Sequence, residues 1–150
     1  MKMLGTAISI AAQAFECVED KGGDPYILHC LHVMREVKAL GEQAQIVAVM
    51  HDIIEDTDWT AEKLIEAGFE ERTVRLIEMV SCREGESYED FVKRASMNPI
   101  SRAVKMADLR HNSDIMRMKG LREKDFQRLE KYHRAYAYLK EAEEHDNSKS

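Results

Sequence analysis

The sequence lacks long apolar runs, has few helix-breaking residues and shows no pairing pattern among its cysteines. No apolar run approaches the roughly 20 residues that a membrane-spanning helix needs, so we expect no membrane partner. Two prolines and seven glycines in 150 residues, with 44% hydrophobic residues, predict a helix-rich globular chain. Cys17, Cys30 and Cys82 are odd in number and far apart. They predict reduced thiols in a cytoplasmic protein and exclude a disulfide framework.

Net positive charge is also lacking, because the formal net charge is −6. We therefore expect no general binding to nucleic acid. The charge is unevenly distributed: residues 90–140 carry 13 Lys and Arg against 6 Asp and Glu, whereas the rest of the chain carries 9 against 22. An acidic part followed by a basic part suits a site for a polyanionic small molecule, although solvated helix faces give the same pattern.

Apolar residues at helical spacing predict an all-α domain with no strand. The length suits one domain with one core, which we expect to span residues 1–144, with residues 145–150 as a disordered tail. Cap residues Asp24, Thr60, Ser87 and Asn98 mark four of the helix starts. Eight helices are predicted, at about residues 6–19, 25–40, 42–54, 60–67, 70–80, 87–96, 99–112 and 123–144.

Residues 51–56, HDIIED, place one histidine and three carboxylates directly after the apolar run 46–50. Imidazole and carboxylate groups suit a divalent metal such as Mn, Fe or Zn. If the helix continues this far, Glu55 returns to the face of His51 and Asp56 to the face of Asp52, since each pair is four residues apart. Capping and turn chemistry is the alternative explanation for Asp56.

Further candidate ligands lie on two other predicted helices. His29 stands near the start of the helix 25–40, where an ordinary exposed histidine is the alternative. Asp108 stands in an apolar stretch, where a carboxylate is costly unless it is paired or binds a metal. Lys105 and Asn112 share its helix face, so a Lys105–Asp108 ion pair is the alternative there. His29 and Asp108, together with His51 and Asp52, make a set of four candidate ligands from three helices.

Three blocks in this order resemble the HD-domain metal-dependent phosphohydrolases. The closer resemblance is to the hydrolase domain of Rel/SpoT-type enzymes, which hydrolyse the alarmone (p)ppGpp. Residues 23–29, GDPYILH, match the motif G-E-P-Y-x-x-H, and residues 51–57, HDIIEDT, match H-D-x-x-E-D-T. Residues 105–112, KMADLRHN, resemble K-L-A-D-R-L-H-N. The likeness covers roughly residues 5–140, and with no synthetase domain recognised the chain resembles the stand-alone small alarmone hydrolases.

The resemblance implies a single-domain HD-type bundle of about eight helices with a divalent metal, usually Mn. It implies that His29, His51, Asp52 and Asp108 hold the metal. It also implies that Glu55 and Asp56 handle the proton and position the attacking water. The residues implied to contact substrate are Lys21, Lys105 and Asn112, together with Arg128 and Tyr132, which resemble an R-x-x-x-Y pair of the animal SpoT homologue.

Two departures from the family pattern bear on the substrate. Asp20 replaces the arginine of an Arg-Lys pair that is associated with stacking on guanine, and Asp114 stands where an arginine is frequent. Both changes put negative charge near an expected polyphosphate. We predict a phosphohydrolase of a phosphorylated nucleotide, foremost a (p)ppGpp 3′-pyrophosphohydrolase. The alternatives are a phosphatase of NADPH, pppApp or a deoxynucleotide, a non-hydrolytic nucleotide sensor, and a helical protein without a site. The sequence predicts no oligomeric state.

Overall fold

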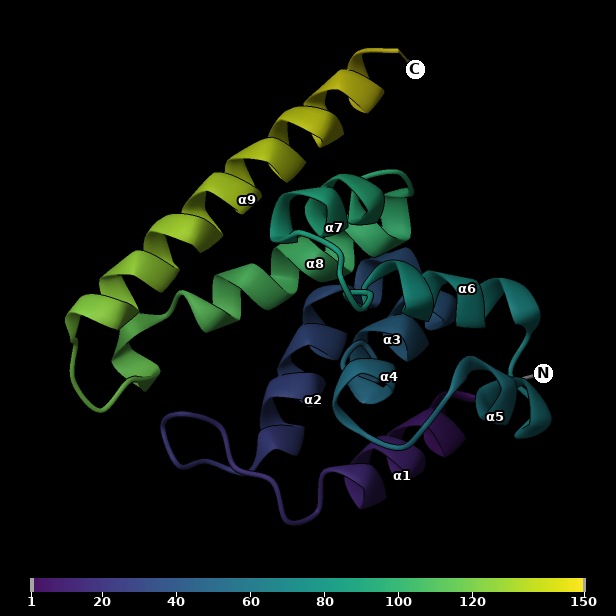
Figure 1. The fold of residues 1–150 in the computed structure, drawn as a ribbon. Helices are drawn as coiled ribbons and strands as arrows, with labels where there is room; N and C mark the ends of the chain where they lie inside the picture. The colour runs from purple at the N-terminus through teal and green to yellow at the C-terminus, as the bar shows by residue number, and fades with distance from the viewer. Residues whose placement is uncertain (1, 150) are drawn as a thin grey trace.

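The computed structural model describes residues 2–149, which form a bundle of helices (Figure 1). The described residues contain no strand, so the predicted all-α class is confirmed. None of their helices is long and apolar enough to cross a membrane. The elements are α1 (Leu4–Ala14), α2 (Tyr26–Glu36), η1 (Lys38–Leu40), α3 (Glu42–Val49), α4 (Ile53–Asp56), α5 (Ala61–Glu66), α6 (Glu71–Met79), α7 (Tyr88–Ala95), α8 (Pro99–Asn112), η2 (Ile115–Arg117) and α9 (Glu123–Ser148).

Helix α3 lies at the centre of the main core, in contact with α1, α2, α6 and α8. Val47, Ala48 and Val49 are fully buried, and so is Met50 just after the helix. Burying an aliphatic side chain of this size stabilises the fold by roughly 1.5–3 kcal/mol. The apolar run therefore fixes α3 inside the bundle and carries the acidic stretch that follows it to the middle of the molecule (Figure 1).

The predicted helix 42–54 is wrong in one respect, because it breaks at Met50. Helix α3 ends at Val49, and α4 begins at Ile53 with Asp52 as its N-cap residue. At this break the carbonyl oxygen of Ala48 accepts both from Nδ1 of His51, at 2.7 Å, and from the backbone N–H of His51, at 3.3 Å. The i to i+4 argument therefore holds only for Asp52 and Asp56, since the carbonyl oxygen of Asp52 accepts the backbone N–H of Asp56 at 2.9 Å, whereas His51 lies in the turn before α4.

The long helix α9 runs alongside α8 and packs against α7 and α8 (Figure 1). Ala135 and Leu139 bury against Val92, Met106 and Leu109 in a second apolar cluster. The helix also continues through residues 145–148, which were predicted as part of a disordered tail. Arg102 Nη1 donates to Asp146 Oδ2 at 2.7 Å, which ties the end of α9 to α8. Residue 1 of the predicted domain and residue 150 of the tail lie outside the described residues.

The caps predicted at Thr60, Ser87 and Asn98 are confirmed, since each side chain accepts a backbone N–H of its helix. The prediction for Asp24 is wrong: α2 begins at Tyr26 with Pro25 in the N-cap position and no side-chain cap. The preceding helix is also shorter than predicted, because α1 ends at Ala14 and a loop fills the interval to Pro25.

Candidate metal centre

Four side chains meet where α2, α8 and the α3–α4 turn come together. They are the four predicted ligands, His29, His51, Asp52 and Asp108, and each offers one ligand atom within 4.8 Å of the others. His29, His51 and Asp108 are buried, and Asp52 is partly exposed. The fold thus brings together residues that are separated by up to 79 positions in the chain.

The ring of His51 is oriented by the backbone. Because the carbonyl oxygen of Ala48 can only accept, Nδ1 of His51 carries the proton of their 2.7 Å hydrogen bond. Nε2 then faces Asp52 Oδ2 at 2.9 Å and Asp108 Oδ1 at 3.3 Å. Among the described residues this buried Nε2 has no partner with hydrogen-bond geometry. A ring nitrogen left without a hydrogen bond beside two carboxylates fits a divalent cation, so the residues present fit a metal.

The same neighbours control the charge of His51. Burial favours the neutral imidazole, but the carboxylates of Asp52 and Asp108 outweigh it and raise the pKa of His51 well above its usual value. The centre therefore attracts positive charge strongly, which is the electrostatic condition for holding a cation.

Asp108 is the most heavily bonded group of the centre. Its Oδ2 accepts from Lys105 Nζ at 3.0 Å, and its Oδ1 accepts from Asn112 Nδ2 at 2.9 Å and faces His29 Nε2 at 2.9 Å. Burial raises its pKa, but Lys105 and His51 together hold that pKa well below its usual range. The Lys105–Asp108 ion pair, an alternative at the level of sequence, is thus present, and both Lys105 and Asn112 orient Asp108.

Tyr26 is a residue of the site to which the sequence assigned no role. Its hydroxyl donates to Asp52 Oδ2. Burial, with Asp52 next, raises the pKa of Tyr26, so the hydroxyl stays protonated and can donate. The available signal was its place in the first motif, three residues before His29.

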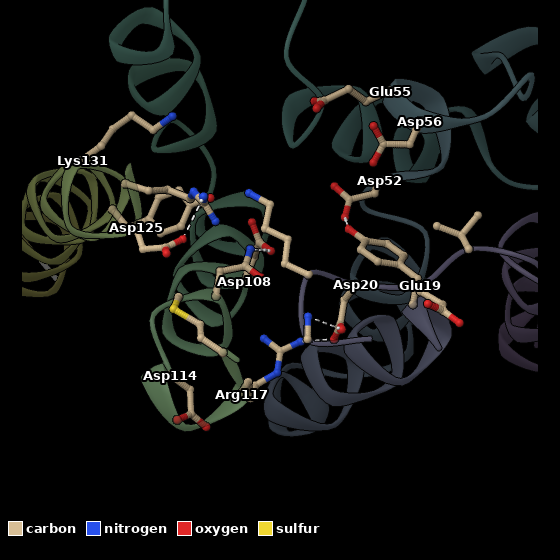
Figure 2. A pocket seen from close by; sticks show the side chains of 18 of the residues that line it. Glu19, Asp20, Asp52, Glu55, Asp56, Asp108, Asp114, Arg117, Asp125 and Lys131 are labelled. Atoms are coloured by element: carbon tan, nitrogen blue, oxygen red, sulfur yellow. Dashed lines mark hydrogen bonds and ion pairs between the residues drawn. The ribbon is translucent and has the colours of Figure 1, made fainter. Parts of the chain in front are cut away.

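The acidic pair of α4 faces a pocket beside the metal centre (Figure 2). Glu55 Oε1 accepts the backbone N–H of Cys82 at 2.7 Å, which fixes the direction of the carboxylate. Desolvation and the neighbouring carboxylates of Asp52 and Glu55 raise the pKa of Asp56 to about 6. A carboxyl group with a pKa near neutral pH can both accept and donate a proton during a reaction.

The pocket has a volume of about 1040 Å³, and its opposite wall is rich in cations. Figure 2 shows Asp52, Glu55 and Asp56 on one side and Lys131 on the other. The cations of this wall come from the loop before α2 and from residues 119–131: Lys21, Lys119, Arg122, Lys124, Arg128 and Lys131. Burial and then the neighbouring Arg128 lower the pKa of Lys21. Such a wall attracts a polyanion.

The remaining predicted substrate residues also line this pocket. Lys21, Arg128 and Tyr132 all reach it, as do Lys105 and Asn112. Arg128 Nη2 donates to Asp125 Oδ1 at 3.1 Å, so part of its charge is already balanced. All five predicted substrate-binding residues therefore line the pocket, although Lys105 and Asn112 also donate hydrogen bonds to Asp108.

Asp20 organises the rim of the pocket. Its Oδ1 accepts the backbone N–H groups of Gly22 and Asp24, both at 2.9 Å, and its Oδ2 accepts from Arg117 Nη2 at 2.8 Å (Figure 2). A Cβ on Gly22 would lie only 2.3 Å from the carbonyl oxygen of Arg117, so this position needs glycine. The expected repulsion between Asp20 and a bound polyphosphate is therefore offset by the positive charge of Arg117. Asp114 has a local role, since it accepts the N–H of Met116.

Comparisons with known proteins agree with this geometry. Residues 7–111 match the family model described as an HD domain. A probable GTP pyrophosphokinase of Mycobacterium leprae is 31% identical over 128 residues, covering 73% of this chain and 16% of the relative. A guanosine-3′,5′-bis(diphosphate) 3′-pyrophosphohydrolase of Aquifex aeolicus is 33% identical over 98 residues, covering 59% of this chain and 14% of the relative. The chain therefore spans less than a fifth of the length of these relatives.

One solved structure has a similar fold. It is described as a metazoan orthologue of SpoT that hydrolyses ppGpp, and it aligns with a TM-score of 0.76, covering 93% of this chain and 85% of the other. At 17% sequence identity, this likeness concerns the fold. The family match extends over more than half of the sequence and includes the four clustered side chains. The chain belongs to the HD domain family.

Proposed function

We propose that this protein is a metal-dependent phosphohydrolase that removes the 3′-diphosphate of (p)ppGpp. The observation that carries the proposal is the cluster of His29, His51, Asp52 and Asp108, which opens on a pocket with acids on one wall and cations on the other. The choice of substrate is supported by the Aquifex relative, which is named a guanosine-3′,5′-bis(diphosphate) 3′-pyrophosphohydrolase, and by the solved structure, which is described as hydrolysing ppGpp. The three cysteines are free, which agrees with the cytoplasmic location that we also propose.

The donor set consists of two imidazoles and two carboxylates, which suits Mn, Fe or Zn, and we propose Mn on the resemblance to Rel/SpoT-type hydrolases. A divalent ion bound here supplies Lewis acidity, which makes water a better nucleophile and polarises a phosphoryl oxygen. Asp52 and Asp108 are held for this task by Tyr26 and Lys105.

The chain's own groups supply proton transfer and orientation. Asp56, which lines the pocket beside Asp52 and Glu55, accepts the proton of the attacking water and returns one to the leaving ribose oxygen as the P–O bond breaks. Glu55, held by the N–H of Cys82, positions that water. Lys21, Arg128 and Lys131 balance the charge of the remaining phosphates across the pocket. The expected products of ppGpp are GDP and diphosphate.

The experiment incubates the protein with Mn²⁺ and ppGpp, pppGpp, pppApp, NADPH or deoxynucleoside triphosphates, and separates the products by anion exchange. We expect turnover of ppGpp and pppGpp, and its loss with EDTA. Asp52→Ala should abolish metal binding and turnover. Asp58→Ala is the matched control, because that exposed carboxylate two residues after Asp56 does not line the pocket.

A second candidate substrate class is another phosphorylated nucleotide, because Asp20 replaces the arginine associated with guanine. Turnover of NADPH, pppApp or a deoxynucleotide in preference to ppGpp would replace the alarmone proposal and keep the hydrolase. Tight nucleotide binding without turnover, with Mn²⁺ bound, would instead indicate a sensor and contradict the proposed reaction.

A further inference from the structure

His111 on α8 contacts His29, one of the four candidate metal ligands. Neither the motif that contains His111 nor the proposed reaction assigns a role to this residue. Its Nδ1 lies 2.7 Å from Nδ1 of His29, 82 residues earlier. The ring planes differ by 8°, and the ring centroids are 5.0 Å apart. At this nitrogen separation, such a centroid distance means that the two nitrogens point at each other in a common plane. This is the geometry of a hydrogen bond between imidazoles.

The other nitrogen of His29 faces the ligand cluster. Nε2 lies 2.9 Å from Asp108 Oδ1 and donates to this carboxylate as long as no cation is bound. Both residues are among those that could hold a cation, and a bound cation would take the place of that proton. An imidazole nitrogen that coordinates a cation presents its lone pair, so the single proton of a neutral ring sits on the opposite nitrogen. With Nε2 as the ligand atom, Nδ1 of His29 must therefore donate, and the group opposite it must accept.

We propose that His111 is a positioning residue of the metal centre, which accepts the Nδ1 proton of His29 and so directs the lone pair of His29 Nε2 toward the metal. The proposal rests on the proposed metal centre. It also assigns the tautomer of His111, whose own proton lies on Nε2 while Nδ1 accepts.

Neighbouring groups hold His111 in this position. Its ring stacks on the ring of His32 from α2, with centroids 3.8 Å apart and planes 13° apart. Its backbone carbonyl oxygen accepts from Arg117 Nη1 at 2.7 Å, at the point where α8 ends. The acceptor is thus fixed by α2 on one side and by the segment after α8 on the other, which suits a residue that orients a ligand.

The first test measures Mn²⁺ affinity by calorimetric titration of the full chain. His111→Leu removes the acceptor and should weaken binding about 10–100-fold, as loss of such partners does at other metal sites. His111→Asn places an acceptor oxygen near the position of Nδ1 and should restore most of the affinity. His133→Leu, which removes an exposed histidine of α9, should bind like wild type.

The second test needs no variant. The ¹⁵N chemical shifts of the histidine rings, measured with Zn²⁺ as a diamagnetic probe, should show His29 protonated at Nδ1 and His111 protonated at Nε2. Protonation of His29 at Nε2 with Zn²⁺ bound would overturn the proposal. Wild-type affinity in His111→Leu would overturn it as well, and equal weakening in His111→Leu and His111→Asn would assign the effect to packing. If the wild-type chain binds neither metal, the proposed metal centre itself fails.

Discussion

Replacing Lys105 by methionine tests the buried charges around Asp108. Lys105 Nζ lies 3.0 Å from Asp108 Oδ2, and the two side chains are only 11% and 7% exposed. Methionine keeps an apolar stem of similar length near the ring of Phe91, whose centroid lies 4.9 Å from Nζ. It removes the ammonium group from Asp108 and leaves His51 as the remaining cationic neighbour, 3.3 Å away. Breaking a buried pair in this way costs about 3–5 kcal/mol. Asn112 and His29 still contact Asp108, so we expect the lower end, about 3 kcal/mol.

The assay is unfolding by urea and by heat in the presence of EDTA. For a chain of this size, a loss of about 3 kcal/mol lowers the Tm by about 6–12 °C. Arg75→Met is the matched control, because Arg75 pairs with Glu71 at 2.6 Å in an exposed i,i+4 pair. Loss of such a surface pair should cost about 0–1 kcal/mol.

Adding Mn²⁺ extends the same experiment to the metal centre. A cation bound beside Asp108 replaces part of the lost positive charge, so the stability gap between wild type and Lys105→Met should narrow. A loss of stability of Lys105→Met in EDTA no larger than that of Arg75→Met would contradict the expected cost of breaking the buried Lys105–Asp108 pair. A gap that stays constant as Mn²⁺ saturates the protein would show that Asp108 does not share its charge with the metal.

Three further changes test separate parts of the structure. Asp20→Ala should free Arg117 and loosen the rim of the pocket, so steady-state kinetics should show a larger rise in KM than fall in kcat, whereas a selective fall in kcat would contradict this role. Arg94 holds the pKa of Glu86 at about 2, below its usual 4.5, so the Glu86 carboxylate stabilises the fold above pH 4.5 and this contribution is lost as the pH falls through about 2. The difference in urea midpoint between wild type and Glu86→Gln should therefore shrink over that range, and a difference independent of pH would contradict this role of Glu86. Asp146→Ala should speed hydrogen exchange in the last turns of α9, and unchanged protection would show that the ion pair with Arg102 does not hold this end.

Local chemistry explains what could be predicted without the fold. The side chains of Thr60, Ser87 and Asn98 bond to backbone N–H groups two or three residues away, so their caps depend on neighbouring residues alone. The all-α class follows in the same way from apolar spacing and the scarcity of proline and glycine. That His29, His51, Asp52 and Asp108 lie together was predictable from the order of the three motifs that resemble HD-domain proteins, and from the cost of a carboxylate without a partner in an apolar stretch.

Asp24 and the helix 42–54 show where local patterns fail. Aspartate before Pro25 suits a cap, but Asp20 organises that loop instead and is itself held by Arg117, 97 residues later in the chain. The break at Met50 depends on a side chain that turns back onto the backbone, with His51 bonded to Ala48. Helical periodicity does not report such a bond, because the bond joins a polar side chain to the backbone and leaves the spacing of apolar residues unchanged.

The helical class, the order of the three motifs and the candidate metal ligands follow from the amino-acid sequence. How these residues are used depends on the packing of the helices: Asp108 is held by Lys105, Asp20 is neutralised by Arg117, and His29 meets His111. Two of these contacts join residues that lie far apart along the chain. Contacts across 82 and 97 positions depend on how α2, α8 and η2 pack together, and no local pattern encodes that packing.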